Sequence, residues 1–156
     1  MGMADLEAIA SHPQVKVAAL CDVDSEYLKA AHALFPDAQI FADYRTLLEQ
    51  YGDQIDAVVV STPDHTHAPA SMLAMEYNKP VYCQKPLTHY VSESREMRKV
   101  ANEKGLVTQM GIQVHSFYDY KLATLLIRKG IVGKVSKVIA WSNKNWGYDG
   151  PIPEGA

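Results

Sequence analysis

Two polar clusters follow two short apolar runs near the middle of this chain. The first cluster, Ser61-Thr-Pro-Asp-His-Thr-His67, comes directly after the β-branched run at 57–60, and the second, Gln84-Lys-Pro86, follows the run at 80–83. A lysine held in a crevice, such as Lys85, can hydrogen-bond a substrate oxygen and stabilise charge that develops on it. These residues predict a site where the oxygen of a small substrate reacts.

Both clusters are expected at one edge of a parallel sheet. The run at 57–60 is continuous and apolar, which is typical of a strand buried on both faces. The run at 80–83 reads as a second short strand, and 68–77 is long enough for a helix between them. Open α/β sheets bind their ligands outside the carboxyl ends of the strands. The two clusters are therefore predicted to face one crevice.

Strand and helix patterns alternate along the rest of the chain, which predicts a doubly wound parallel sheet with helices on both faces, an α/β fold of the Rossmann type. Asp43 is expected to cap the helix at 44–51, and Gly105 to end the helix at 91–104. The predicted helices are 4–11, 25–34, 44–51, 68–77, 91–104 and 118–129, and the predicted strands are 15–21, 39–41, 57–60, 80–83, 106–110 and 135–141.

The first strand of a dinucleotide-binding unit is missing from this pattern. Such a unit has a strand, a glycine-rich turn, a helix, and an acidic residue about 20 residues later. Asp22 fits the acidic residue and Gly2 the last glycine of the turn, but no strand precedes the helix at 4–11. The absent strand would lie in the middle of the sheet, where unpaired edges are unfavourable. We therefore expect an amino-terminally truncated sequence or a misplaced start.

The composition is that of an ordinary globular polypeptide. The chain has 156 residues, of which 47% are hydrophobic and 21% charged, which fits one domain or one domain and part of another. A net charge of −3 offers no basic surface to nucleic acid, and no apolar run approaches the roughly 18 residues of a membrane span. Cys21 and Cys83 lie in apolar runs and are predicted to be reduced, buried thiols. We expect a cytoplasmic protein that acts on a small molecule.

Four ordered motifs resemble the signatures of the Gfo/Idh/MocA oxidoreductases, the glucose-fructose oxidoreductase and inositol dehydrogenase family. They lie at 20–24, 62–67, 84–87 and 130–135. The resemblance covers nearly all of this chain but only about the first half of a typical member. It implies an NAD(P)-binding Rossmann domain over 1–116, and over 117–156 the start of an α/β domain with an open sheet, whose first helix and strand would be 118–129 and 135–141. The resemblance implies that this second domain serves substrate binding and oligomerisation, and that the full-length protein is a homo-oligomer. The family's catalytic histidine would lie beyond Ala156.

The resemblance also implies roles for individual residues. Lys85 is the catalytic candidate, and the alternative is a solvated surface lysine. Gln84 departs from the family's usual glutamate: an amide keeps the hydrogen-bond geometry but loses the negative charge beside the lysine. The implied cofactor contacts are Gly2, Asp22, Thr62, Pro63, His65, His67, Gln84, Lys85 and Gln113, and the candidate substrate contacts are His115 and Trp146.

Several of these assignments have alternatives. Asp22 can accept hydrogen bonds from both adenosine-ribose hydroxyls and would repel a 2′-phosphate, which favours NAD over NADP, but it could also be a plain loop carboxylate. His65 and His67 could bind a metal, yet no third ligand is evident and the family uses no metal. A turn-stabilising role is the other alternative for this pair. The aromatic segment around Trp146 could form a sugar platform or a packed core.

The expected function is hydride transfer between NAD(P) and a hydroxyl carbon of a sugar, polyol or related small molecule. One alternative is an NAD-dependent glycosidase that oxidises a sugar hydroxyl transiently. Another is a module that binds a cofactor or a partner without catalysis. Residues 1–156 alone are expected to be inactive and to bind NAD poorly, because pyrophosphate affinity depends on amides at the glycine turn.

Overall fold

The computed structural model describes residues 2–141. The chain divides into two compact units, Met1–Gln113 and Val114–Ala156. In the first unit, helices and strands alternate as α1 (Gly2–Ala10), β1 (Ala19–Cys21), α2 (Ser25–Leu34), β2 (Gln39–Phe41), α3 (Tyr44–Tyr51), β3 (Val58–Val60), α4 (His67–Glu76), β4 (Val81–Gln84), α5 (Val91–Lys104) and β5 (Thr108–Gly111). Short 3₁₀ turns lie at Gly52–Gln54 and Asp64–Thr66, a short helix α6 spans Gln113–Ser116, and α7 in the second unit spans Tyr118–Arg128.

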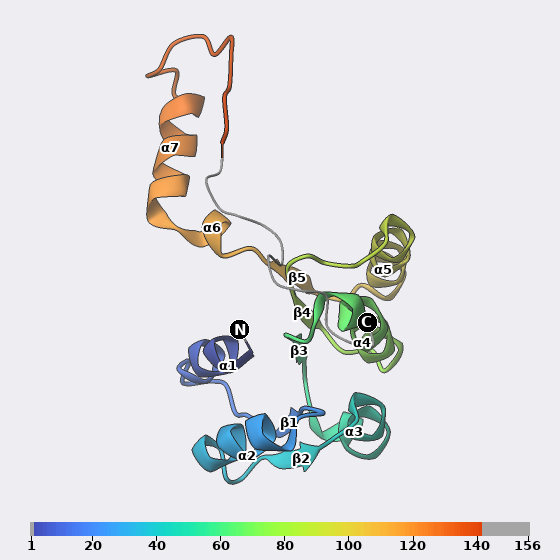
Figure 1. Ribbon diagram of the computed structural model, residues 1–156. Coiled ribbons are helices and arrows are strands. Elements are labelled where there is room, and N and C mark those ends of the chain that lie inside the picture. The colour runs from blue at the N-terminus through green and yellow to red at the C-terminus, as the bar shows by residue number, and fades with distance from the viewer. Residues whose placement is uncertain (1, 142–156) are drawn as a thin grey trace, which may run out of the picture. The chain divides into compact units, whose positions relative to one another are not determined.

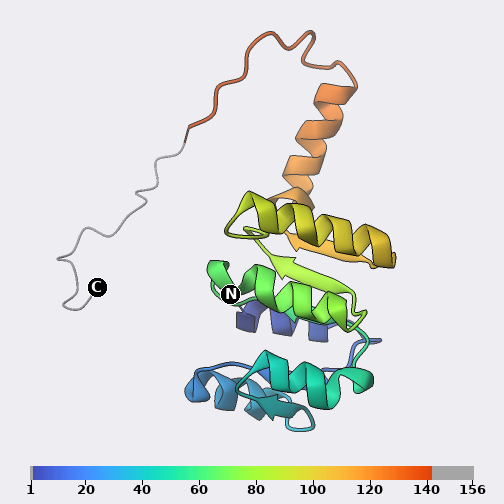
Figure 2. The same ribbon diagram turned by 90° about the vertical axis from the view of Figure 1, so that its right-hand side faces the viewer.

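All strand pairs in the first unit are parallel, which confirms the predicted α/β class. β3, β4 and β5 form one sheet in that order, with Val59 opposite Tyr82 and Gln84 opposite Gly111. β1 and β2 form a second sheet. Helices α3, α4 and α5 cover one face of these strands, and α1 and α2 lie on the other (Figure 1). Figure 2 shows the same three helices side by side in front of the strands.

The two sheets are not joined to each other within residues 2–141. β1 is hydrogen-bonded only to β2, and β3 only to β4, so each keeps one unpaired edge among the described residues. The order β2-β1, then β3-β4-β5, fits a doubly wound sheet that has one further strand between β1 and β3. This is the place where the sequence predicts the absent strand.

The helix ends follow local sequence signals. The Asp24 side chain accepts from the backbone amide of Glu26 at 2.8 Å and so caps α2. Asp43 accepts from the amide of Arg45 at 2.8 Å and caps α3, as predicted. Gly105 has φ of 63° after α5, a left-handed conformation that glycine adopts without a steric penalty.

The core of the first unit is centred on α4. The side chains of Ala74 and Met75 are almost completely buried, at 0% and 1% exposure. They lie in one apolar cluster with Val60 of β3 and Val81 of β4, so α4 anchors the two strands that carry the polar clusters. The cluster also contains Leu47, Leu48, Ala68, Ala70, Cys83, Met97 and Ala101.

Three predictions about packing are wrong. Residues 135–141 form no strand, because no neighbouring strand among the described residues supplies backbone partners. Val59 is 42% exposed, because β3 lies at the edge of its sheet and is not enclosed on both faces. Cys21 is exposed rather than buried, since β1 is also an edge strand; like Cys83, it is a free thiol.

Lys104 joins the carboxyl ends of α4 and α5. Its Nζ donates to the backbone carbonyls of Met75 and Glu76 at 2.9 and 3.0 Å, and to Oδ1 of Asn78 at 2.9 Å. A cation at a helix carboxyl end satisfies free carbonyls and interacts favourably with the helix dipole. We expect Lys104→Met to lower the free energy of unfolding by about 1 kcal/mol, as measured by urea denaturation.

Lys99→Met is the matched control for this prediction. Lys99 lies on the same helix but forms only an exposed ion pair with Glu96, at 3.2 Å. Exposed pairs contribute little to stability, so this variant should unfold like the unaltered protein. Equal losses in the two variants would show that Lys104 does not hold the end of α4.

Candidate functional site

The amino end of α1 lies against the carboxyl end of β3. A Cβ atom added to Gly2 would stand 3.7 Å from Cβ of Ser61. In the first turn of α1, Asp5 accepts a hydrogen bond from Oγ of Ser61 at 2.6 Å. The free amides and the positive dipole end of a helix favour anions at such a position. Gly2 therefore lies where the carboxyl end of β3 meets a potential anion site.

Gln84 is held by hydrogen bonds at both ends of its amide. It is 3% exposed, and its Nε2 donates to both carboxylate oxygens of Asp5, each at 2.9 Å. Its Oε1 accepts from the backbone amide of Lys85 at 3.1 Å. Sequence analysis missed Asp5, because Asp5 and Gln84 are 79 positions apart and no local motif links them. It placed Ser61 in the first polar cluster but gave it no role of its own.

Lys85 follows directly after β4 and is exposed. It forms no ion pair in the part of the chain that the structure describes. Its peptide bond to Pro86 is cis. The hydrogen bond to Gln84 fixes the backbone of Lys85, while the side chain is exposed. The ammonium group is therefore accessible to a ligand and is carried by an ordered backbone.

His67 connects the two polar clusters. It is the first residue of α4 and is 1% exposed. Nδ1 lies 2.6 Å from the carbonyl oxygen of Pro86, and Nε2 lies 2.8 Å from that of Thr62. Each ring nitrogen therefore faces a backbone carbonyl, and the ring donates to at least one of them, which favours the turn-stabilising alternative for His67 over direct contact with a ligand.

The turn after β3 presents exposed side chains around this histidine. Thr62, Pro63 and His65 are all exposed. Within the turn, the Pro63 carbonyl accepts from the amide of Thr66 at 2.9 Å and from its hydroxyl at 2.8 Å. These two hydrogen bonds stabilise the turn that carries His65. Unlike His67, His65 is exposed and accessible to a ligand.

Asp22 lies directly after β1, where its side chain is exposed. Its Oδ1 accepts from the backbone amide of Asp24 at 2.9 Å. Although Cys21 is exposed as a residue, burial of its thiol, together with the charges of Asp43 and Asp22, raises the pKa of that thiol to about 11. Asp22 therefore follows β1, and Asp43, which follows β2 and pairs with Arg45 at 3.2 Å, lies near the same thiol.

The remaining predicted residues, Gln113, His115 and Trp146, lie in the second half of the chain. Gln113 is exposed at the start of α6, two positions after β5. His115 belongs to the second unit, where its ring stacks on that of Tyr120 with centroids 5.3 Å apart. Trp146 lies outside the described residues.

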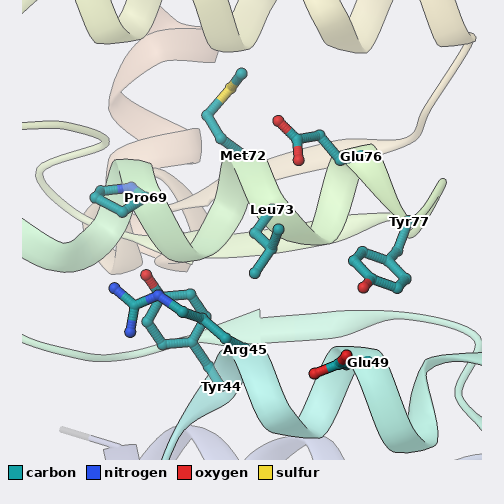
Figure 3. Close-up of a pocket in the computed structure, with 8 residues that line it drawn as sticks. All are labelled: Tyr44, Arg45, Glu49, Pro69, Met72, Leu73, Glu76 and Tyr77. Carbon is teal, nitrogen blue, oxygen red and sulfur yellow. The ribbon is translucent and has the colours of Figure 1, made fainter.

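A separate groove of about 350 Å³ lies between α3 and α4 (Figure 3). Tyr44, Leu73 and Tyr77 contribute to its walls, and Arg45 stands over the Tyr44 ring with 4.6 Å between the guanidinium carbon and the ring centroid. Among the predicted cofactor and substrate residues that the structure describes, none lines this groove. It is therefore distinct from the site formed by the two polar clusters at the carboxyl ends of β3 and β4.

Residues 2–141 contain no group of three or more histidine, cysteine or acidic side chains arranged to hold a metal ion. Within the same residues, no helix has the length and apolar character needed to cross a membrane.

Comparison with known proteins connects this arrangement to a described family. Residues 1–112 match the GFO_IDH_MocA family, an oxidoreductase family with an NAD-binding Rossmann fold. The match includes Gly2, Asp22, both polar clusters and every strand of the first unit.

Individual relatives are similar over a part of their length. An inositol 2-dehydrogenase of Rhodococcus jostii is 31% identical over 78% of this chain and 34% of its own. A 2,7-anhydro-N-acetylneuraminate hydratase of Mediterraneibacter gnavus is 29% identical over 64% of this chain and 26% of its own. The crystal structure of scyllo-inositol dehydrogenase from Lactobacillus casei with NAD(H) and scyllo-inositol matches with a TM-score of 0.77 and 25% identity, over 85% of this chain and 39% of that one.

Proposed function

This chain belongs to the Gfo/Idh/MocA family of oxidoreductases, whose Rossmann fold binds NAD, and from that premise we propose that it forms the cofactor-binding part of a sugar or polyol dehydrogenase. The reaction is hydride transfer between NAD and a hydroxyl carbon of the substrate. One observation carries the proposal: the amino end of α1, the Ser61–His67 turn and Gln84-Lys85 meet at the carboxyl ends of β3 and β4.

The residues at this edge fit a dinucleotide. The first turn of α1 offers backbone amides to the pyrophosphate, and Gly2 has no side chain to obstruct its approach. Asp22 is exposed at the end of β1, where a ribose hydroxyl would find an acceptor. The charge of Asp22 disfavours a 2′-phosphate, which supports NAD over NADP. Bound NAD supplies the hydride chemistry.

Lys85 has the catalytic role in this proposal. Its ammonium group donates a hydrogen bond to the substrate oxygen and stabilises negative charge as hydride leaves or reaches the attached carbon. The contacts of His67 with the carbonyls of Thr62 and Pro86 hold the turn after β3 and the turn after β4 at a fixed separation. The residues that would contact the cofactor therefore keep a constant position relative to Lys85. His65 and Gln113 are available as further contacts at the same edge.

A second candidate function is sugar-bond cleavage or hydration through transient oxidation. The similarity to a 2,7-anhydro-N-acetylneuraminate hydratase favours it, since that relative is a hydratase and not a dehydrogenase. Both candidates use the same cofactor edge, and product analysis separates them. A net dehydrogenase accumulates NADH, whereas transient oxidation leaves the amount of NAD unchanged.

Two further properties belong to this proposal. The free thiols of Cys21 and Cys83 support a reducing, cytoplasmic location. On α7, Leu125 and Ile127 are 51% and 52% exposed, which supports burial of this helix against further protein in a homo-oligomer.

Replacement of Asp22 tests the cofactor assignment. In the full-length protein, Asp22→Ala should weaken NADH binding by about 1 to 3 kcal/mol, the range for hydrogen bonds to a charged acceptor. NADPH binding should weaken less or improve, because the variant removes a charge that repels its 2′-phosphate. Fluorescence titration with both cofactors measures the difference.

Asp37→Ala is the matched control, since Asp37 is an exposed aspartate that precedes β2 at the opposite end of the strands. This variant should bind both cofactors like the unaltered protein. Equal losses of NADH and NADPH affinity in Asp22→Ala would mean that Asp22 does not contact the ribose.

A further inference from the structure

We propose that Asp5 is a positioning residue for Lys85, acting through the side chain of Gln84. This role rests on the proposed function, because it concerns the lysine that contacts the substrate. Asp5 lies in the first turn of α1 and Lys85 follows β4, so the contact joins the helix start that faces the cofactor to the strand that carries the lysine.

The Asp5 carboxylate determines which way the Gln84 amide points. A carboxylate only accepts hydrogen bonds, so the amide must turn its Nε2 toward Asp5, at 2.9 Å from each oxygen. The carbonyl end, Oε1, then faces the backbone amide of Lys85 at 3.1 Å. With the opposite orientation, two donors would face each other at Lys85 and two acceptors at Asp5.

Two neighbours confine this pair. Ser61 donates to Oδ2 of Asp5 at 2.6 Å and so holds the carboxylate from the end of β3. Behind the amide lies Gly111 of β5: a Cβ atom there would stand 3.0 Å from both Cδ and Nε2 of Gln84. With Gln84 only 3% exposed, the amide has little room to choose another orientation.

The pair is complementary because it contains one carboxylate and one amide. A second carboxylate at position 84 would place two negative charges in contact at a largely buried position. An exchange of the two groups would instead keep a hydrogen bond at each contact, with one bond between positions 5 and 84 in place of the present two. The carboxylate introduced by Gln84→Glu would accept from the Lys85 amide and from the side-chain amide introduced by Asp5→Asn, whose carbonyl would accept from Ser61. Positions 5 and 84 should therefore behave as one unit.

The test is a reversal of the pair in the full-length protein. We expect Asp5→Asn and Gln84→Glu each to lower kcat by about tenfold, the scale expected when a reacting group is displaced. The double variant, Asp5→Asn with Gln84→Glu, should recover to within about threefold of the unaltered protein. NADH affinity, from a parallel titration, should change by less than kcat in all three variants.

The same Asp5→Asn substitution made in the Lys85→Ala variant shows whether Asp5 positions the lysine or supports the structure in general. In Lys85→Ala, adding Asp5→Asn should lower the residual kcat by less than about twofold, since the lysine to be positioned is gone. Glu7→Gln, an exposed substitution on α1, controls for changes to the helix surface and should leave kcat unchanged. Thermal unfolding of every variant checks that it is folded.

Each outcome bears on the proposal. If the effects of Asp5→Asn and Gln84→Glu simply add in the double variant, or if Asp5→Asn costs the same tenfold without Lys85, Asp5 does not position the lysine. Failure of the unaltered protein to turn over any NAD-linked sugar or polyol would overturn the proposed function, and this role with it. Turnover without recovery in the double variant would overturn only the role of Asp5.

Discussion

Lys85→Ala in the full-length protein is expected to lower kcat by roughly 10²- to 10³-fold, the scale found when one donor to a transition-state charge is removed. The structure fixes the backbone of Lys85 through Gln84 and leaves its side chain exposed beside the turn that His67 braces. NADH affinity should change much less, because a dinucleotide is held mainly through its pyrophosphate and ribose. Steady-state kinetics and NADH titration measure the two effects separately.

Two further variants make this prediction specific. Lys85→Arg should restore little activity, because a planar guanidinium does not reproduce a compact ammonium group and does not release its proton. Lys79→Ala removes a lysine that precedes β4, at the other end of the same strand, and should leave kcat unchanged. A folded Lys85→Ala enzyme that keeps more than about a third of its turnover would contradict the assignment, since that corresponds to a barrier change below roughly 0.7 kcal/mol.

A further strand that pairs with both β1 and β3 should affect cofactor binding about as strongly as Lys85→Ala affects kcat. A form of the protein in which a further parallel strand and glycine turn lead into α1 should bind NADH about 100-fold more tightly than residues 1–156, since two or three hydrogen bonds to the pyrophosphate are worth roughly 3 kcal/mol together. The physical reason is that one edge of β1 and one edge of β3 have no partner among the described residues.

Titration of NADH into the two forms under the same conditions measures this ratio. Asp22→Ala made in both forms is the matched control: it should weaken binding in the longer form but change little in the shorter one. Dissociation constants that agree within about threefold would show that the unpaired edges of β1 and β3 do not limit binding.

Much of the fold was predictable because the signals are local. The helices at 25–34, 44–51 and 91–104 occupy their predicted ranges; Asp43 caps the second of them and Gly105 ends the third, as predicted. The strands were placed correctly in order; β2 occupies its predicted range, and β1, β3 and β5 are shorter than predicted. β1, for example, begins at Ala19 rather than at 15, because a strand extends only as far as a neighbour supplies hydrogen bonds.

The site was predictable only in part. Motif position brought out Lys85 and Gln84, but the partner of Gln84 is Asp5 in a distant helix, which no short-range pattern reveals. His67 was predicted as a cofactor contact with a turn-stabilising role as an alternative, and its burial and its two backbone carbonyl neighbours favour that alternative. The strand predicted at 135–141 failed because alternation of side chains does not form a strand without a partner.

Amide hydrogen exchange of the full-length protein, measured with and without saturating NADH, tests the central claim most directly. If the cofactor binds at the carboxyl ends of β1, β3 and β4, NADH should slow exchange at 22–24, at 61–67 and at 84–87, and leave the groove between α3 and α4 unchanged. Saturable NADH binding that protects only that groove, around Tyr44 and Tyr77, would contradict this account, as would the absence of saturable binding.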